Sequence, residues 1–80
     1  MKNKNILELF GGCGGFGYGF YKYNFNILCC NEFDKVIAET YKYNFPNTHM
    51  IIGDVTHTNT KNDIYNCFID NTCDIIIGGP

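Results

Sequence analysis

A run of glycines near the N-terminus is the first feature of this sequence that could perform chemistry. Residues 12–17 read Gly-Cys-Gly-Gly-Phe-Gly and match the pattern G-x-G-x-x-G. Glycine lets the backbone turn sharply and lets a ligand lie against bare peptide. The run follows an apolar stretch and precedes a helix-like one, which is the context that connects the pattern with nucleotide cofactors. Alone the pattern is weak, because an ordinary glycine turn also explains it.

An acid and an aromatic residue follow the next apolar stretch. Glu32 lies twenty residues after Gly12, at the end of the second predicted strand. A carboxylate at this place can accept hydrogen bonds from both hydroxyls of a ribose. The alternative is an exposed acid at a helix start, stabilised by the helix dipole. Phe33 could cover the face of an adenine, and its alternative is an ordinary core phenylalanine.

A second acid ends the third predicted strand, in the sequence Gly53-Asp54-Val55. Asp54 can accept a hydrogen bond from an adenine amino group, and the amide of Val55 can donate to a ring nitrogen. The alternative for Asp54 is an Asx turn or a helix cap. Two acids at the ends of adjacent strands fit an adenosine-sized ligand better than a pyrophosphate.

Four short apolar runs are expected to form the strands that position these residues. The predicted strands are residues 5–10, 26–30, 49–53 and 73–77. The runs are continuously apolar rather than alternating, as expected for a parallel sheet covered on both faces by helices. The sequence therefore predicts an α/β fold: a partial doubly wound, Rossmann-like sheet of four parallel strands with alternating helices. Such a sheet binds its ligand at the carboxyl ends of the strands.

Three helices are predicted between the strands, the first two with clear signals. Phe16, Gly19, Phe20 and Tyr23 are spaced to share one face of the first helix. Gly17 and Gly19 each weaken that helix by roughly 1 kcal/mol relative to Ala and suggest a close backbone approach. In the second helix, Asp34 can cap the start and Ile37, Ala38 and Tyr41 share a face, and Pro46 requires an end by Phe45.

The third helix has a weaker start signal. Thr60 with Asp63 resembles a capping box in which Asp replaces Glu. Ile64, Cys67 and Phe68 would then face the sheet.

Composition limits the part that this segment could play in binding nucleic acid. The 80 residues have a net charge of −2, with six scattered lysines and no arginine. A nucleic-acid groove normally has a basic footprint. If the whole protein binds DNA, most of the contacts are expected outside this segment.

The remaining chemistry-bearing residues are expected to be structural. The five cysteines are odd in number and show no C-x-x-C spacing, so we expect reduced, mostly buried thiols and no metal. His49 and His57 are expected at the surface. No apolar run approaches the roughly 20 residues that span a bilayer, and no signal peptide is recognisable. These features predict a protein that is not secreted and lies in the cytoplasm, or in the nucleoid or nucleus with the genome.

Four motifs in order resemble those of the DNA cytosine-5 methyltransferase family. They extend over nearly the whole chain: residues 7–16 (Leu-Glu-Leu-Phe-Gly-Gly-Cys-Gly-Gly-Phe), residues 31–34 (Asn-Glu-Phe-Asp) with the helix and turn of residues 38–46, residues 53–55 (Gly-Asp-Val), and residues 74–80 (Asp-Ile-Ile-Ile-Gly-Gly-Pro). The resemblance implies that residues 1–80 are the N-terminal part of the catalytic domain of such an enzyme, with no second domain.

The resemblance also implies a cofactor, S-adenosyl-L-methionine, and a site for it. The methionine part would be surrounded by Phe10, Gly12, Cys13, Gly14, Gly15 and Phe16. Glu32 would hold the ribose hydroxyls, Phe33 would pack on the adenine, and Asp54 with Val55 would contact the adenine edge.

No catalytic residue is expected within these 80 residues. The family continues Pro-Cys-Gln after the position of Pro80, so the nucleophilic cysteine would lie two residues further on. Contacts to double-stranded DNA would also lie downstream, and the chain alone is predicted to be inactive. Family enzymes use the thiolate to attack C6 of a flipped-out cytosine before the methyl group is transferred to C5.

Three alternatives remain open from the sequence. A tRNA cytosine-5 methyltransferase of the same family shares these motifs. A nicotinamide or flavin oxidoreductase is supported only by the glycine pattern and Glu32. A non-catalytic module that binds an adenosine cofactor is the third.

Overall fold

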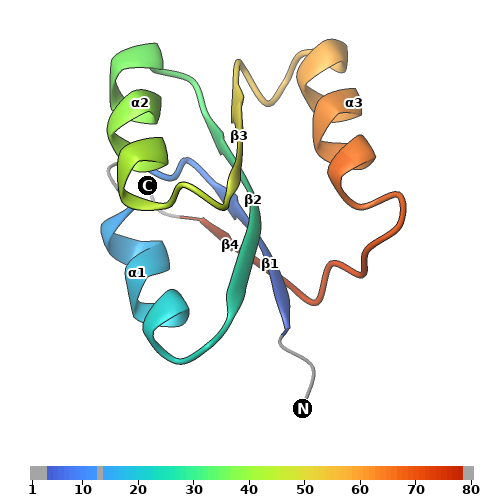
Figure 1. The fold of residues 1–80 in the computed structure, drawn as a ribbon. Coiled ribbons are helices and arrows are strands. Elements are labelled where there is room, and N and C mark those ends of the chain that lie inside the picture. The colour runs from blue at the N-terminus through green and yellow to red at the C-terminus, as the bar shows by residue number, and fades with distance from the viewer. Residues whose placement is uncertain (1–3, 13, 79–80) are drawn as a thin grey trace.

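Four parallel strands form the centre of the computed structural model, which describes residues 4–12 and 14–78. Three helices alternate with them (Figure 1). The elements are β1 Asn5–Leu9, α1 Gly15–Lys22, β2 Asn26–Glu32, α2 Lys35–Asn44, β3 His49–Ile52, α3 Thr58–Cys67 and β4 Ile75–Gly78. The predicted fold class and order of elements are confirmed.

The strand order β3-β2-β1-β4 creates the place where a ligand would bind. From β1 the chain moves outward to β2 and β3, then returns to the other side of β1 to add β4. Because all pairs are parallel, the carboxyl ends of the strands lie along one edge of the sheet. The order reverses at β1, and doubly wound sheets bind ligands beside such a reversal.

The core consists of two layers, one on each face of the sheet. Helices α1 and α2 lie on one side and α3 on the other (Figure 1). The first layer contains Ile27, Cys30, Tyr41 and Phe45, and the second contains Leu7, Cys29 and Ile51 with Ile64, Cys67 and Phe68 against them. Neighbouring residues of a strand point to opposite faces, so Cys29 and Cys30 serve different layers.

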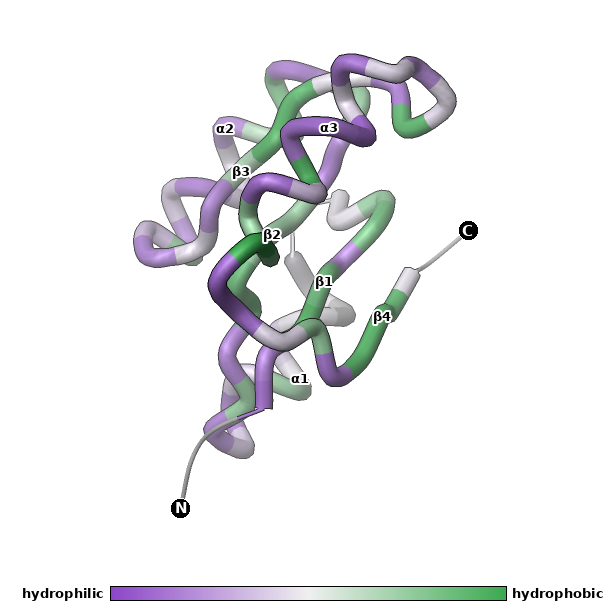
Figure 2. The backbone as a smooth tube through the Cα atoms, turned by 90° about the vertical axis from the view of Figure 1, so that its right-hand side faces the viewer, coloured by the Kyte–Doolittle hydropathy of each residue, from purple (hydrophilic) through white to green (hydrophobic). Residues whose placement is uncertain are grey.

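The hydropathy of the chain follows this architecture. Strand β4 is hydrophobic over most of its length, whereas α3 is mostly hydrophilic (Figure 2). Helix α3 packs against the sheet through the partly buried Ile64 and Cys67, together with Phe68 directly after the helix, as predicted. Within the described residues, no helix is long and apolar enough to cross a membrane.

Helix α2 agrees with its sequence signals except at Ile37, which was predicted on the face shared by Ala38 and Tyr41. The Asp34 carboxylate accepts hydrogen bonds from the amides of Val36 and Ile37 at 2.9 and 3.0 Å, which confirms the predicted cap. Ala38 and Tyr41 are buried against the sheet, while Ile37 is exposed. The helix ends at Asn44, just before Phe45 and Pro46.

The predicted face of α1 is wrong at Gly19 and Tyr23, whereas Phe20 is half-buried. Tyr23 lies beyond the helix and is 75% exposed, and Gly19 has open space around it. The helix approaches the sheet at Gly17, where an added Cβ would lie 2.9 Å from Ile27 Cδ1. The absence of a side chain, rather than an apolar stripe, therefore sets the contact. Periodicity cannot detect a contact of this kind, although the prediction of a close approach is confirmed at Gly17.

The predicted start of α3 is also wrong. The helix begins three residues earlier, at Thr58, with His57 rather than Thr60 at the N-cap and no capping side chain. Thr60 is buried instead, with its hydroxyl close to Gly53. Strand ends differ as well: β1 and β3 each stop one residue early, β2 continues to Glu32, and β4 covers Ile75–Gly78 rather than 73–77.

Candidate functional site

The predicted site residues meet at the carboxyl edge of the sheet. Phe10 follows β1, Glu32 ends β2, and Asp54 with Val55 follows β3. Parallel strands place these ends side by side, although the residues are far apart in the sequence. Cys13 lies outside the described residues.

An open pocket of about 290 Å³ lies between these strand ends. Its lining contains four predicted residues and two others: Phe10, Asn31, Phe33, Gly53, Asp54 and Val55. Phe33 is 70% exposed, so the alternative of a buried core phenylalanine is wrong. Phe10 is exposed as well. Two aromatic side chains that face solvent beside a polar turn form a suitable lining for a flat ring.

Phe10 owes its position to an unusual backbone conformation. Its φ is 56°, in the left-handed region that residues with a bulky side chain rarely adopt. The chain turns sharply there, directly after β1 and before the glycine loop. Such strain persists where the surroundings fix it, and it is often found at ligand sites.

The Glu32 carboxylate joins the glycine loop to the start of α2. Its Oε1 accepts a hydrogen bond from the amide of Gly12 at 3.0 Å, and its Oε2 accepts one from the amide of Asp34 at 2.7 Å. Each carboxylate oxygen can accept a further hydrogen bond. Glu32 is therefore held in one orientation and keeps acceptor capacity for a ligand.

The glycine loop positions its backbone through two left-handed residues. Gly12 and Gly14 have φ values of 58° and 95°. A Cβ at Gly14 would overlap the Phe45 ring, whereas the space around Gly12 is open. Gly12 therefore leaves its backbone open to a ligand, next to the Glu32 carboxylate.

Two other loop residues face a different pocket. Gly14 and Gly15 line a pocket of about 300 Å³ together with Tyr18, Tyr21, Asn44 and Phe45. The structure therefore does not bring Gly14 and Gly15 into the pocket that Phe10 lines. Phe16 belongs to α1, and its side chain lies outside the described part of the structure.

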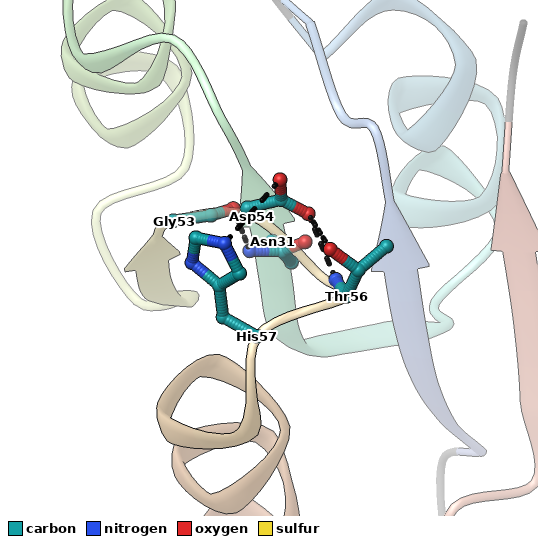
Figure 3. A network of polar contacts seen from close by, with 5 residues as sticks. All are labelled: Asn31, Gly53, Asp54, Thr56 and His57. Atoms are coloured by element: carbon teal, nitrogen blue, oxygen red, sulfur yellow. Dashed lines mark hydrogen bonds and ion pairs between the residues drawn. The ribbon is translucent and has the colours of Figure 1, made fainter.

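Asp54 lies in a network of polar contacts after β3 (Figure 3). Its Oδ1 accepts hydrogen bonds from the Thr56 amide at 2.8 Å and from the Thr56 hydroxyl at 2.7 Å. These bonds lower the pKa of Asp54, with a smaller contribution from His57, whose Nε2 lies 3.9 Å from Oδ2. The Asx-turn alternative therefore describes the local structure, and it leaves the carboxylate charged at the pocket.

The next residue supplies a donor beside this acceptor. The amide of Val55 has no hydrogen-bond acceptor among the described residues. An acceptor and a donor on consecutive residues can pair with a ring edge that carries an amino group next to an unprotonated nitrogen.

A buried acid that was not predicted from the sequence lies below the glycine loop. Glu8 in β1 is 1% exposed and accepts a hydrogen bond from the Tyr41 hydroxyl at 2.7 Å. Burial raises the pKa of Glu8, while hydrogen bonds from Tyr41 and the Gly17 amide oppose that shift. A charged residue in an otherwise apolar strand is the signal that could have revealed it.

Two of the described thiols, those of Cys29 and Cys30, are not suited to nucleophilic work, whereas Cys67 is half-buried and Cys73 is exposed. Cys29 and Cys30 are buried, and burial raises the pKa of both thiols, that of Cys30 to about 12. A thiol acts as a nucleophile only as the thiolate. No group of three or more potential metal ligands occurs within residues 4–12 and 14–78. Both histidines are exposed, as predicted.

The fold and site together define a doubly wound α/β unit with a glycine loop and two acids at its carboxyl edge. Residues 4–80 match the family model of the C-5 cytosine-specific DNA methylases. The chain belongs to this family, and the nicotinamide or flavin alternative loses its support.

Individual relatives agree with this assignment. The chain is 43% identical over 75 residues to the type II methyltransferase M.NgoPII of Neisseria gonorrhoeae, covering 94% of this chain and 20% of that protein. It is 41% identical over 76 residues to the type II methyltransferase M.DdeI of Desulfomicrobium norvegicum, covering 95% and 18%. The chain thus spans about a fifth of the length of these relatives.

A solved structure has the same fold. It is described as a DNA modification methyltransferase encoded within an E. coli prophage. The TM-score is 0.82 at 29% sequence identity, over 98% of this chain and 22% of the other.

Proposed function

We propose that this chain binds S-adenosyl-L-methionine and forms the cofactor-holding part of a DNA cytosine-5 methyltransferase. The observation that carries the proposal is the convergence of Phe10, Phe33, Asp54 and Val55 on one pocket at the strand ends. Membership of the family gives this pocket its chemical meaning.

The residues present fit an adenosine group. Asp54 offers an acceptor and Val55 a donor, which complements the amino group and adjacent ring nitrogen of adenine. Phe10 and Phe33 expose aromatic faces at the same pocket. Glu32 keeps acceptor capacity for the ribose hydroxyls while two backbone amides fix its orientation. The open backbone at Gly12 would lie beside the remainder of the ligand.

The work of these residues is to bind and to orient. Bound S-adenosyl-L-methionine supplies an electrophilic methyl group. Glu32 would set the position of the ribose, and Asp54 with Val55 would fix the orientation of the base. Holding a reactant in one orientation lowers the entropic cost of a later reaction.

We propose that methyl transfer belongs to the whole protein and that residues 1–80 alone do not perform it. The reaction needs a thiolate that attacks the cytosine, and the buried thiols of Cys29 and Cys30 are held protonated. The resemblance assigns that role to a cysteine two positions beyond Pro80. The low basic charge is consistent with DNA contacts elsewhere. The names of the relatives, which describe type II and DNA-modifying methyltransferases, favour DNA over tRNA.

Calorimetric titration of the chain with S-adenosylhomocysteine tests the proposal. We expect saturable binding, no binding of NADH, and a loss of about tenfold or more in Glu32→Gln, because hydrogen bonds to a charged group contribute about 1.5–3 kcal/mol. Glu39→Gln is the matched control, because Glu39 is exposed on α2. A chain that does not bind, or that loses as much affinity in the control, would contradict the proposal.

A further inference from the structure

A buried asparagine lies directly behind the turn that ends β3. Asn31 is the residue before Glu32 in β2, is 1% exposed, and lines the pocket with Asp54 and Val55. Burying an amide side chain is costly unless its donors are satisfied. The partners of the Asn31 side chain therefore indicate why a polar residue occupies this place.

Both partners are backbone carbonyls on either side of the end of β3. Asn31 Nδ2 donates to the carbonyl oxygen of Ile51 at 3.0 Å. It also donates to the carbonyl oxygen of Gly53 at 3.1 Å (Figure 3). The amide of Gly53 in turn donates to the carbonyl oxygen of Glu32 at 3.1 Å. Gly53 is thus bonded to β2 through its N–H and its C=O, one residue before Asp54.

The other side of Gly53 is closed by α3. Its φ is 156°, and a Cβ added there would lie 2.6 Å from the Thr60 hydroxyl. The turn therefore lies between the Asn31 carboxamide and the first turn of α3, with little space to shift. Asp54 and Val55 project from this fixed point toward the pocket.

We propose that Asn31 is a positioning residue that gives the cofactor site its preference for adenine. It touches the backbone that presents the Asp54 carboxylate and the Val55 amide, and it acts on the ligand through them. The inference rests on the proposed function, because it assumes that this pocket holds the adenine.

The chemistry of the side chain explains the choice of asparagine. One carboxamide nitrogen supplies two hydrogens, one for each carbonyl. Aspartate would place a carboxylate against two carbonyl oxygens, serine supplies a single hydrogen, and alanine supplies none. The hydrogen bonding of the side chain at position 31 to the turn should therefore weaken in the order asparagine, serine, alanine.

A binding comparison with two ligands tests this role. S-adenosylhomocysteine is compared with S-inosylhomocysteine, whose base has an oxygen in place of the amino group and a proton on N1. Both changes oppose the pairing with Asp54 and Val55. We expect the unaltered chain to prefer the adenine ligand by roughly tenfold or more, because a mismatched polar group leaves its partners unpaired. In Asn31→Ala the preference should fall to about threefold or less, and Asn31→Ser should lie between them.

Thr48→Val is the matched control for lost stability. Thr48 is buried like Asn31, and its hydroxyl donates to the carbonyl oxygen of Ile27 at 2.7 Å, before β3 rather than after it. This variant should lose thermal stability yet keep the full preference for adenine. Should Asn31→Ala fail to fold, Asn31→Ser decides the question, because it retains one donor.

The outcomes separate the inference from the function it rests on. If the unaltered chain binds neither ligand, the proposed function is wrong and the inference with it. If the chain prefers adenine and the Asn31 variants keep that preference, the inference alone is overturned. An equal loss of preference in Thr48→Val also overturns the inference, because a general loss of stability of the fold would then explain the effect.

Discussion

Two neighbouring regions of the sheet use acidic residues in opposite ways. In the middle of β1, Glu8 is closed off from solvent and accepts hydrogen bonds from the Tyr41 hydroxyl and the Gly17 amide. At the strand ends, Glu32 and Asp54 are partly exposed, and backbone amides hold them in place. The first region joins both helices of one face to the sheet. The second leaves acceptors at the carboxyl edge of the sheet, where Asp54 lines a pocket.

The contrast shows that the surroundings of an acidic side chain decide whether it holds packed elements together or remains available to a ligand. A buried carboxyl group pays for desolvation and is retained where its hydrogen bonds hold packed elements together. An acid oriented by backbone amides at a strand end keeps its charge and its spare lone pairs. Three predictions follow this contrast, beginning with the change that should disturb the buried region most.

The buried region should not accept even one additional methyl group. In Gly17→Ala the new Cβ would collide with the Glu8 carboxylate and lie 2.9 Å from Ile27 Cδ1. We expect the free energy of unfolding to fall by about 1–2 kcal/mol, because overpacking costs about 1–3 kcal/mol and helix propensity returns up to about 1. Urea denaturation measures the change.

Gly19→Ala provides the control on the same helix. Nothing lies within 4 Å of a Cβ at Gly19, so the substitution should stabilise the chain by about 0.5–1 kcal/mol. Equal effects of the two substitutions would mean that the close contact between α1 and Glu8 is not a constraint on the fold.

The fold could be predicted from the sequence because its signals are local. Continuous apolar runs predicted a parallel sheet, and Asp34 and Pro46 marked the ends of α2. The face of α1 could not be predicted, because a glycine makes the contact and hydrophobic periodicity measures only side chains. The start of α3 was missed because the hydroxyl of Thr60 lies against Gly53, a neighbour that is fixed only by the tertiary structure.

The meeting of four candidate site residues at one pocket was also predictable from the sequence. Phe10, Phe33, Asp54 and Val55 meet at one pocket because strand ends can be located from the apolar runs. Asn31 and Glu8 were missed, because each acts through partners distant in the chain. The carbonyl groups that Asn31 contacts lie 20 and 22 residues away, and the hydroxyl that Glu8 contacts lies 33 residues away. Such pairings depend on strand order and register, which the sequence does not state.

The second prediction concerns pH. Burial raises the pKa of Glu8 above its ordinary value of 4.5, so the folded state binds its proton more tightly than the unfolded state does. The stability gained in this way is fully present below pH 4.5 and is lost as the pH rises through the raised pKa. Glu8→Gln should remove this dependence. The free energy of unfolding of the variant should therefore increase relative to that of the unaltered chain as the pH rises. Urea denaturation from about pH 4 to pH 8 measures the difference.

Tyr41→Phe sharpens the same test. The Tyr41 hydroxyl lowers the pKa of Glu8, so its removal should raise that pKa further and extend the loss of stability to higher pH. A parallel pH profile for the unaltered chain and Glu8→Gln would show that Glu8 is not the titrating group, and the contrast between the two regions would lose its basis.

The smallest effect on stability is expected at the strand end. In Asp54→Asn the retained Oδ1 can still accept from the Thr56 amide and hydroxyl, so the free energy of unfolding should change only slightly. Affinity for S-adenosylhomocysteine should nevertheless fall by about tenfold, because the charged acceptor for the adenine amino group is lost. Denaturation and calorimetry on one preparation compare the two effects.

Glu8→Gln should show the reverse, with altered stability and nearly unchanged affinity, since Glu8 lies below the pocket rather than in its lining. If Asp54→Asn instead unfolds the chain or leaves affinity intact, the acids at the strand ends stabilise the fold. Solvent exposure would then not distinguish acids that bind a ligand from acids that hold the fold together.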